Sequence, residues 1–196
     1  MPPTQIWTIG HSDRSLETFL DLLRHHAVTM VVDVRKMPRS RHNPQFNEDT
    51  LPGVLDDAGL RYVHMPGLGG LRRPRPDSPN MGWRNTSFRA YADYMLTPEF
   101  EQSIQSLLEQ AADQSAALMC AEAVPWRCHR SLIADALVVR GVSVAHILGP
   151  TQIQTHVLRS WASVEGTTIT YPRQVEEEAF LAVQDKSGAS SGQSSL

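Results

Sequence analysis

The chain has 196 residues, of which 41% are hydrophobic, and a formal net charge of −3, which suits a single domain with an ample core. The negative charge argues against nucleic-acid binding through bulk positive charge, although arginines cluster at 35–41, 72–75 and 127–130. The sequence contains no apolar stretch of roughly 18 residues and no signal sequence, so we expect a cytoplasmic protein that makes no contact with a membrane.

The first predicted elements are a strand and a helix. Residues 5–9 are a short run rich in β-forming residues, and Ser15 is a suitable N-cap for a helix whose apolar residues recur at helical spacing over 16–23. His11 and Ser12 follow the strand directly. We therefore expect both side chains at the carboxyl end of the first strand.

The second predicted strand, over residues 28–34, has the nearly uninterrupted apolar pattern of a strand that is buried on both faces. It is followed over 36–47 by a loop rich in proline, arginine and asparagine. Arg35, Arg39 and Arg41 lie at this junction. Guanidinium groups suit phosphate and carboxylate oxygens, so these arginines form an anion clamp in one interpretation and a solvated basic loop in the other.

A third strand is predicted over 60–64 and ends in His64. The segment 65–86 that follows has little periodic pattern, and a loop of this length is typical of a lid or a binding loop. Gly69 and Gly70 within it permit close approach of the backbone to a ligand. This glycine pair matches neither a P-loop nor a dinucleotide-binding fingerprint, so we expect no cofactor such as ATP or NAD.

Further helices are predicted over 97–113 and 151–162, and a further strand over 142–148. Strands that alternate with helices indicate an α/β fold. We expect a single domain over residues 1–185, with a mainly parallel sheet of about five strands flanked by helices. Residues 186–196 are mostly serine, glycine and alanine and are expected to form a disordered tail.

The segment 115–141 contains the candidate chemistry. An apolar run stops at Cys120, a polar loop contains Cys128 and His129, and a helix follows. With Arg130 and a helix N-terminus nearby, the pKa of a cysteine thiol can fall from ~8.5 into roughly 3.5 to 7.5. In the alternative interpretation both cysteines are small buried hydrophobes. Their spacing matches no standard zinc site, so we expect no metal. A disulfide between them is sterically possible but is not expected, because two cysteines in a chain of this size do not make a secreted scaffold.

In a parallel sheet the carboxyl ends of the strands converge on one rim, where ligands bind. The candidate catalytic residues at this rim are Cys128, Cys120, Glu122, His129 and His11, and the candidate substrate-binding residues are Ser12, Asp33, Arg35, Arg39, Arg41, His64, Gly69, Gly70 and Arg130. Because Arg35 and Arg130 are predicted at the ends of elements, we expect them to bind an anion from outside the core and to contribute little to stability.

The sequence also contains six short motifs, in the order TIGHS at 8–12, DVR at 33–35, PRSR at 38–41, YVHMPGLGG at 62–70, FRAYADYM at 88–95 and MCAE…CHR at 119–130. Through these motifs the chain resembles the domain of unknown function 488 family over roughly residues 6–150. The resemblance implies an α/β fold and a shared polar site, without an assigned reaction.

The order of a strand, Cys120, a loop, Arg130 and a helix is also similar to the arrangement of rhodanese sulfurtransferases and cysteine phosphatases, in which a loop cradles an anion over a thiolate. Their arginine lies closer along the chain to the nucleophile than Arg130 lies to Cys120. A phosphatase-type loop therefore cannot simply be carried over to Cys120.

These observations support two hypotheses. In the first, the protein is an enzyme that binds an anionic, phosphate- or nucleotide-like substrate at the rim, with Cys128 or Cys120 as nucleophile or redox thiol. Glu122 and His129 are then the acid–base groups. In the second, the protein is a non-catalytic module that holds a nucleotide or a nucleic-acid end, and the cysteines are structural. The flanking arginines predict that Cys128 is the more reactive thiol.

Overall fold

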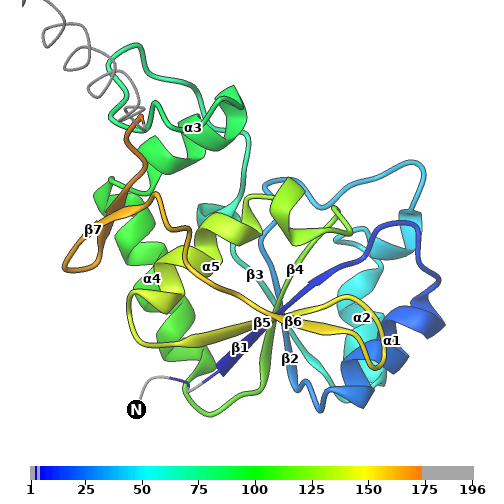
Figure 1. The fold of residues 1–196 in the computed structure, drawn as a ribbon. Coiled ribbons are helices and arrows are strands. Elements are labelled where there is room, and N and C mark those ends of the chain that lie inside the picture. Colours follow the sequence, from blue (N-terminus) through cyan, green and yellow to red (C-terminus); the bar gives the residue numbers. More distant parts are fainter. Residues whose placement is uncertain (1–2, 4, 174–196) are drawn as a thin grey trace, which may run out of the picture.

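In the computed structural model, which describes residues 3 and 5–173, a six-stranded sheet lies between two layers of helices (Figure 1). The strands are β1 (Gln5–Gly10), β2 (Met30–Asp33), β3 (Arg61–His64), β4 (Ala116–Cys120), β5 (Ser143–Ile147) and β6 (Ile153–Thr155). Their order is β3-β2-β4-β1-β5-β6, and all neighbouring pairs are parallel except β5 with β6. The predicted α/β fold with a mainly parallel sheet is confirmed, with one strand more than expected in that sheet.

The helices divide between the two faces of the sheet. Helices α1 (Leu16–His25) and α2 (Leu51–Asp57) cover one face, and α3 (Thr86–Tyr94), α4 (Pro98–Ala111) and α5 (Arg130–Val138) contribute to the core on the other (Figure 1). Short 3₁₀ turns are η1 (Pro44–Phe46), η2 (Pro66–Leu68) and η3 (Pro125–Arg127), and β7 (Ser163–Glu165) with β8 (Thr168–Thr170) forms a separate hairpin. Successive side chains of β2 alternate between the layers, because Val31 packs with α1 and α2 while Val32 packs with the opposite core.

Side-chain caps fix two of the helix starts. The Ser15 hydroxyl accepts the Thr18 N–H at 3.1 Å, and the Thr97 hydroxyl accepts the Phe100 N–H at 3.3 Å. Pro98 is the first residue of α4, a position where its missing N–H costs no hydrogen bond. Both helix starts agree with the sequence prediction.

The connections around β1 and β4 create a crevice at the carboxyl edge of the sheet. From β1 the chain passes through α1 to β2 on one side of the sheet order, and from β4 it passes through α5 to β5 on the other side. The two helices lie on opposite faces, and ligands of open α/β sheets bind where the strand order reverses in this way. Gly10 pairs in register with Cys120, so these two residues flank the crevice.

The helix predicted over 151–162 is wrong, because this segment forms β6 and an irregular stretch. After the turn at Gly149 and Pro150 the chain doubles back, and the backbone of 153–155 pairs with β5 instead of forming intrahelical hydrogen bonds. The tail predicted over 186–196 lies outside the described residues. No helix within the described ranges is long and apolar enough to cross a membrane.

Candidate functional site

A cavity of about 690 Å³ opens at the carboxyl ends of β1, β2 and β4. Its lining comes from the segments that follow these strands and β3, and from the start of α5: His11, Ser12, Asp13, Arg35, Lys36, Met37, Arg39, Ser40, Asn43, Gly70, Leu71, Cys120, Ala121, Glu122, Ala123 and His129. A cavity of this size is typical of small-molecule sites. The crevice that the strand order predicts is therefore a cavity large enough to hold a small molecule.

Two cysteine sulfurs lie in contact at the bottom of this crevice. Both thiols are free, and Cys120 Sγ lies 2.7 Å from Cys128 Sγ. Cys120 lines the cavity, whereas Cys128 lies behind it and does not. The side chains are only 3% and 6% exposed, respectively. The backbone N–H of Arg130, the first residue of α5, points to Cys128 Sγ at 3.5 Å, and His129 Nδ1 lies 3.7 Å from the same sulfur.

The two thiols have opposite pKa shifts. The hydrogen bond from Cys120 lowers the pKa of Cys128 well below its usual value, against the opposing effect of burial, and His129 and Arg130 add to the lowering. Burial, together with the hydrogen bond to Cys128, raises the pKa of Cys120 well above its usual value. Of the two thiols, Cys128 is therefore the one that loses its proton more readily.

Arg130 is buried, although the sequence predicted an anion ligand outside the core. Its guanidinium group donates to the Glu122 carbonyl at 2.5 Å and to the Thr8 hydroxyl at 3.3 Å, and it does not line the cavity. The reason is that its side chain extends from the start of α5 into the loop that follows β4, where the Glu122 and Ala123 carbonyls accept its hydrogen bonds. Arg130 holds the loop after Cys120 in place and brings a positive charge close to both sulfurs.

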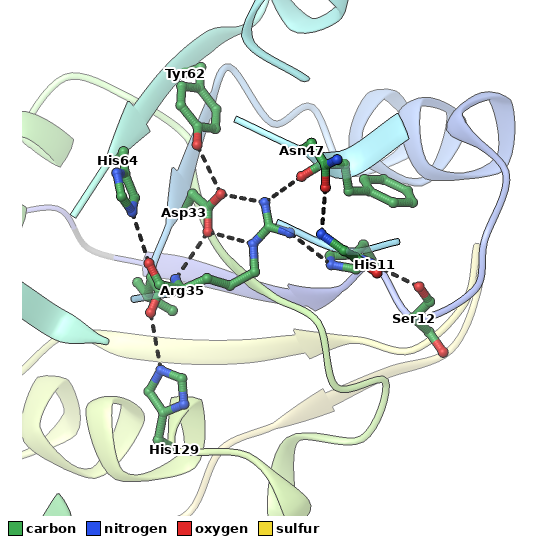
Figure 2. A network of polar contacts seen from close by, with 11 residues as sticks. His11, Ser12, Asp33, Arg35, Asn47, Tyr62, His64 and His129 are labelled. Carbon is green, nitrogen blue, oxygen red and sulfur yellow. Dashed lines mark hydrogen bonds and ion pairs between the residues drawn. The ribbon is translucent and has the colours of Figure 1, made fainter. Parts of the chain in front are cut away.

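Arg35 is also buried and belongs to a second network, shown in Figure 2. Its guanidinium group binds the Asp33 carboxylate through two hydrogen bonds, from Nε at 2.9 Å and from a terminal nitrogen at 2.6 Å. The same group donates to the Phe46 carbonyl at 2.6 Å and to His11 Nε2 at 3.1 Å, and the Tyr62 hydroxyl donates to Asp33 at 2.9 Å. The expectation that Arg35 lies outside the core is therefore wrong, since most of its donors are occupied within the protein.

His11 is fixed by contacts on both ring nitrogens. Its Nδ1–H donates to the Ser12 carbonyl at 2.8 Å, and its Nε2 accepts from Arg35 (Figure 2). Its ring stacks on Phe46 with centroids 4.3 Å apart. Burial lowers the pKa of His11 to about 4, so the ring is neutral at pH 7. Proton transfer at His11 would require one of these two hydrogen bonds to break.

Two further histidines bind the backbone beside Arg35. His64 Nε2 donates to the Arg35 carbonyl at 2.8 Å, and His129 Nε2 donates to the Val34 carbonyl at 3.3 Å (Figure 2). Because a carbonyl oxygen can only accept, His129 Nε2 carries a proton, and Nδ1 is the ring nitrogen that faces Cys128. Gly70 closes over this ring, because a Cβ atom there would lie 3.2 Å from His129 Nδ1.

Eight of the predicted site residues line the cavity: His11, Ser12, Arg35, Arg39, Gly70, Cys120, Glu122 and His129. The other six lie outside its lining: Asp33, Arg41, His64, Gly69, Cys128 and Arg130. Asp33 and His64 hold Arg35 through hydrogen bonds, the Cys128 sulfur contacts that of Cys120, and Arg130 binds the Glu122 carbonyl. Gly69 packs against the Lys36 backbone, and Arg41 is exposed in its loop.

Several lining residues were not predicted from the sequence, namely Asp13, Lys36, Met37, Ser40, Asn43, Leu71, Ala121 and Ala123. Of the three basic residues in the lining, Arg35 and Arg39 pair with Asp33 and Glu48, while Lys36 has no ion pair within the described part of the chain. A lysine next to an arginine-rich motif was visible in the sequence, but no pattern separated it from its neighbours.

Within the described residues, no group of three or more histidine, cysteine or acidic side chains is arranged to hold a metal ion. A protein-family model with the description "Domain of unknown function DUF488" matches residues 15–137. Neither the curated proteins nor the solved structures include a match to the chain. None of the comparisons supports the likeness to rhodaneses and cysteine phosphatases.

Proposed function

The chain belongs to the DUF488 family, a domain of unknown function, and on this premise we propose that its cavity is the active site of an enzyme that attacks a small anionic substrate with a cysteine thiolate. One observation carries the proposal. Cys120 lines the cavity, and its sulfur contacts that of Cys128, whose pKa is lowered by this contact and by the nearby His129 and Arg130. Such a pair supplies a nucleophile and a proton acceptor together.

The roles of the two cysteines follow from their positions. Cys120 is the nucleophile, since a substrate in the cavity reaches Cys120 and not Cys128. Transfer of the Cys120 proton across the 2.7 Å contact to Cys128 moves the thiolate into the cavity without changing the net charge of the buried pair. His129 Nδ1 lies 3.7 Å from Cys128 Sγ and extends this line of contacts.

Binding of the anionic group belongs to the loop that follows β2. Lys36 lines the cavity without an ion pair among the described residues, and the pair of Arg39 with Glu48 is exposed and therefore weak. Both side chains are available for a phosphate-like or carboxylate group. The buried charge of Arg130 favours an anion through its field and not through contact, whereas the charge of Arg35 is compensated by Asp33. Reduced thiols of this kind fit a cytoplasmic location.

The test compares two alkylating reagents, anionic iodoacetate and neutral iodoacetamide, on the native protein. Each rate is divided by the rate of the same reagent with a free cysteine peptide. On this scale we expect iodoacetate to modify Cys120 faster than iodoacetamide does. Inorganic phosphate should slow the modification by iodoacetate. Lys36→Gln should reduce the preference for iodoacetate by about fivefold, because a unit charge at ~4 Å contributes about 1 kcal/mol in water. Arg24→Gln, which removes an exposed cation from α1, is the matched control and should leave the preference unchanged.

The burial of both sulfurs favours one other function, a non-catalytic module that binds a nucleotide or a nucleic-acid end with structural cysteines. This alternative predicts that neither reagent modifies the native protein while a nucleotide still binds. Modification of Cys120 that is slow with both reagents and insensitive to phosphate would remove the proposed enzyme and leave this module.

A further inference from the structure

The contact between the two sulfurs allows more than proton transfer. The chain contains two cysteines, and their Sγ atoms lie 2.7 Å apart, compared with a covalent S–S distance of about 2.05 Å. Both side chains are held in place from opposite sides, Cys120 at the end of β4 and Cys128 just before α5. A small approach of the sulfurs therefore joins them in a disulfide without rearrangement of the fold.

We propose that Cys120 and Cys128 are a redox pair that reduces a disulfide within a small organic anion, an inference that rests on the proposed anion-binding site. The Cys120 thiolate attacks one sulfur of the substrate, forms a mixed disulfide and releases the first substrate half as a thiolate. The released half takes up the proton that Cys120 had passed to Cys128. The Cys128 thiolate then attacks Cys120 Sγ, forms the Cys120–Cys128 disulfide and releases the second half as a thiolate. The substrate gains two electrons, which the pair loses, and an external thiol restores the reduced pair.

The position of each sulfur assigns its role in this exchange. A substrate in the cavity reaches Cys120, and Cys128 reaches the substrate only through Cys120. The Arg130 N–H at the start of α5 and the Arg130 guanidinium group both favour negative charge on Cys128. Thiolate character is what a resolving cysteine needs, since the thiolate is the attacking species in disulfide exchange.

The cavity lining also indicates the rest of the substrate. Lys36 provides a cation for an acidic group, and the adjacent Met37 lines the cavity with 69% of its surface exposed. Leu71 lines it as well, with 75% exposed, from the segment after β3. The two segments touch, because a Cβ atom at Gly69 would lie 2.9 Å from Lys36 Cα. An anion with an apolar or aromatic body matches this combination of a free ammonium group and two exposed apolar side chains.

The probe for the test is dithiobis(nitrobenzoate), an aromatic dicarboxylate disulfide whose released thiolate absorbs visible light. For the full-length reduced protein we expect two thiolates released per chain, a mass lower by two hydrogen atoms and no retained adduct. Cys128→Ser should release one thiolate and retain the other half of the probe on Cys120. Cys120→Ser should react at least about tenfold more slowly, since Cys128 does not line the cavity.

A wild-type chain that retains probe on its cysteines and forms no internal disulfide would overturn the redox pair and leave the proposed anion site standing. The second control uses dithiodipyridine, a neutral disulfide, with each rate divided by that of free cysteine. If it forms the internal disulfide as fast as the dicarboxylate probe does, the anion site is overturned and the redox pair stands. The wild-type mass tests the pair even where a serine variant fails to fold, and circular dichroism identifies such a variant.

Discussion

At the scale of single residues, burial decides what the arginines of the rim contribute. Arg35 compensates the charge of Asp33, which is fully buried, so truncation of Arg35 leaves a buried carboxylate without its cationic partner. Removal of one member of a buried ion pair costs about 3–5 kcal/mol. We therefore predict that Arg35→Ala lowers the free energy of unfolding by roughly this amount in denaturant titrations.

Arg39→Ala is the matched control for this prediction, because Arg39 also forms an ion pair, with Glu48, but its side chain is 79% exposed. Exposed ion pairs contribute about 0–1 kcal/mol, so this variant should unfold at nearly the wild-type denaturant concentration. Equal stability losses in the two variants would contradict the assignment of Arg35 to the core.

The sequence predicted where Arg35, Arg39 and Arg41 lie along the chain but not which of them is buried. Asp33 and Arg35 are two residues apart at the end of an apolar strand, and this spacing places both side chains on the same face. The pairing was therefore visible in principle. The Phe46 carbonyl and His11, which complete the coordination of Arg35, come from other segments and carry no signal in the sequence.

At the scale of elements, the site depends on close contact between the end of β1 and the loop after β4. A Cβ atom at Gly10 would lie 1.9 Å from the Glu122 carbonyl oxygen, the atom that accepts from Arg130. Gly10→Ala must therefore push this loop away from β1. We predict a loss of about 1–3 kcal/mol in the free energy of unfolding, as for other overpacked sites, together with altered alkylation of Cys120.

Gly53→Ala tests whether the Gly10 effect is steric. Gly53 lies within α2, and a Cβ atom there has no neighbour within 4 Å. Alanine should therefore stabilise the helix by about 0.5–1 kcal/mol and leave the cysteines unchanged. A Gly10→Ala protein as stable as Gly53→Ala would show that the loop after β4 yields without cost.

The elements that the sequence predicted well are those with strong local signals. The N-cap residues Ser15 and Thr97 start α1 and α4 as expected, and the apolar run that ends at Cys120 forms a fully buried strand. The segment 151–162 lacks such signals, and its pairing with β5 is a tertiary contact that outweighs local preference. The contact of Cys128 with Cys120 likewise depends on the conformation of the loop that contains η3. The spacing of the two cysteines in the sequence does not reveal this conformation.

At the scale of the whole molecule, hydrogen bonds connect the cysteine site to the β5–β6 edge of the sheet. Thr8 of β1 accepts from Arg130 and contacts His146 Nδ1 at 2.7 Å. His146 Nε2 bonds to His156 at 3.0 Å, and His156 bonds to Asp135 of α5 at 2.7 Å. This chain of contacts links β1, β5, α5 and the segment after β6, so the positions of these elements are coupled to that of Arg130.

His146 in this chain and His11 at the cavity make the stability of the whole molecule depend on pH. Burial lowers the pKa of each from 6.5 to about 4, so the unfolded chain binds protons more readily than the folded chain between these values. Stability is therefore fully present above about pH 6.5 and is lost as the pH falls towards 4, with an upper limit of about 3 kcal/mol for each histidine.

Denaturant titrations at several pH values across this range measure the loss. His146→Gln should make the free energy of unfolding depend less steeply on pH. The control is His25→Gln, which replaces an exposed histidine on α1 and should leave this dependence unchanged. A wild-type stability that stays constant from pH 6.5 to 4 would mean that neither ring is held neutral by the fold.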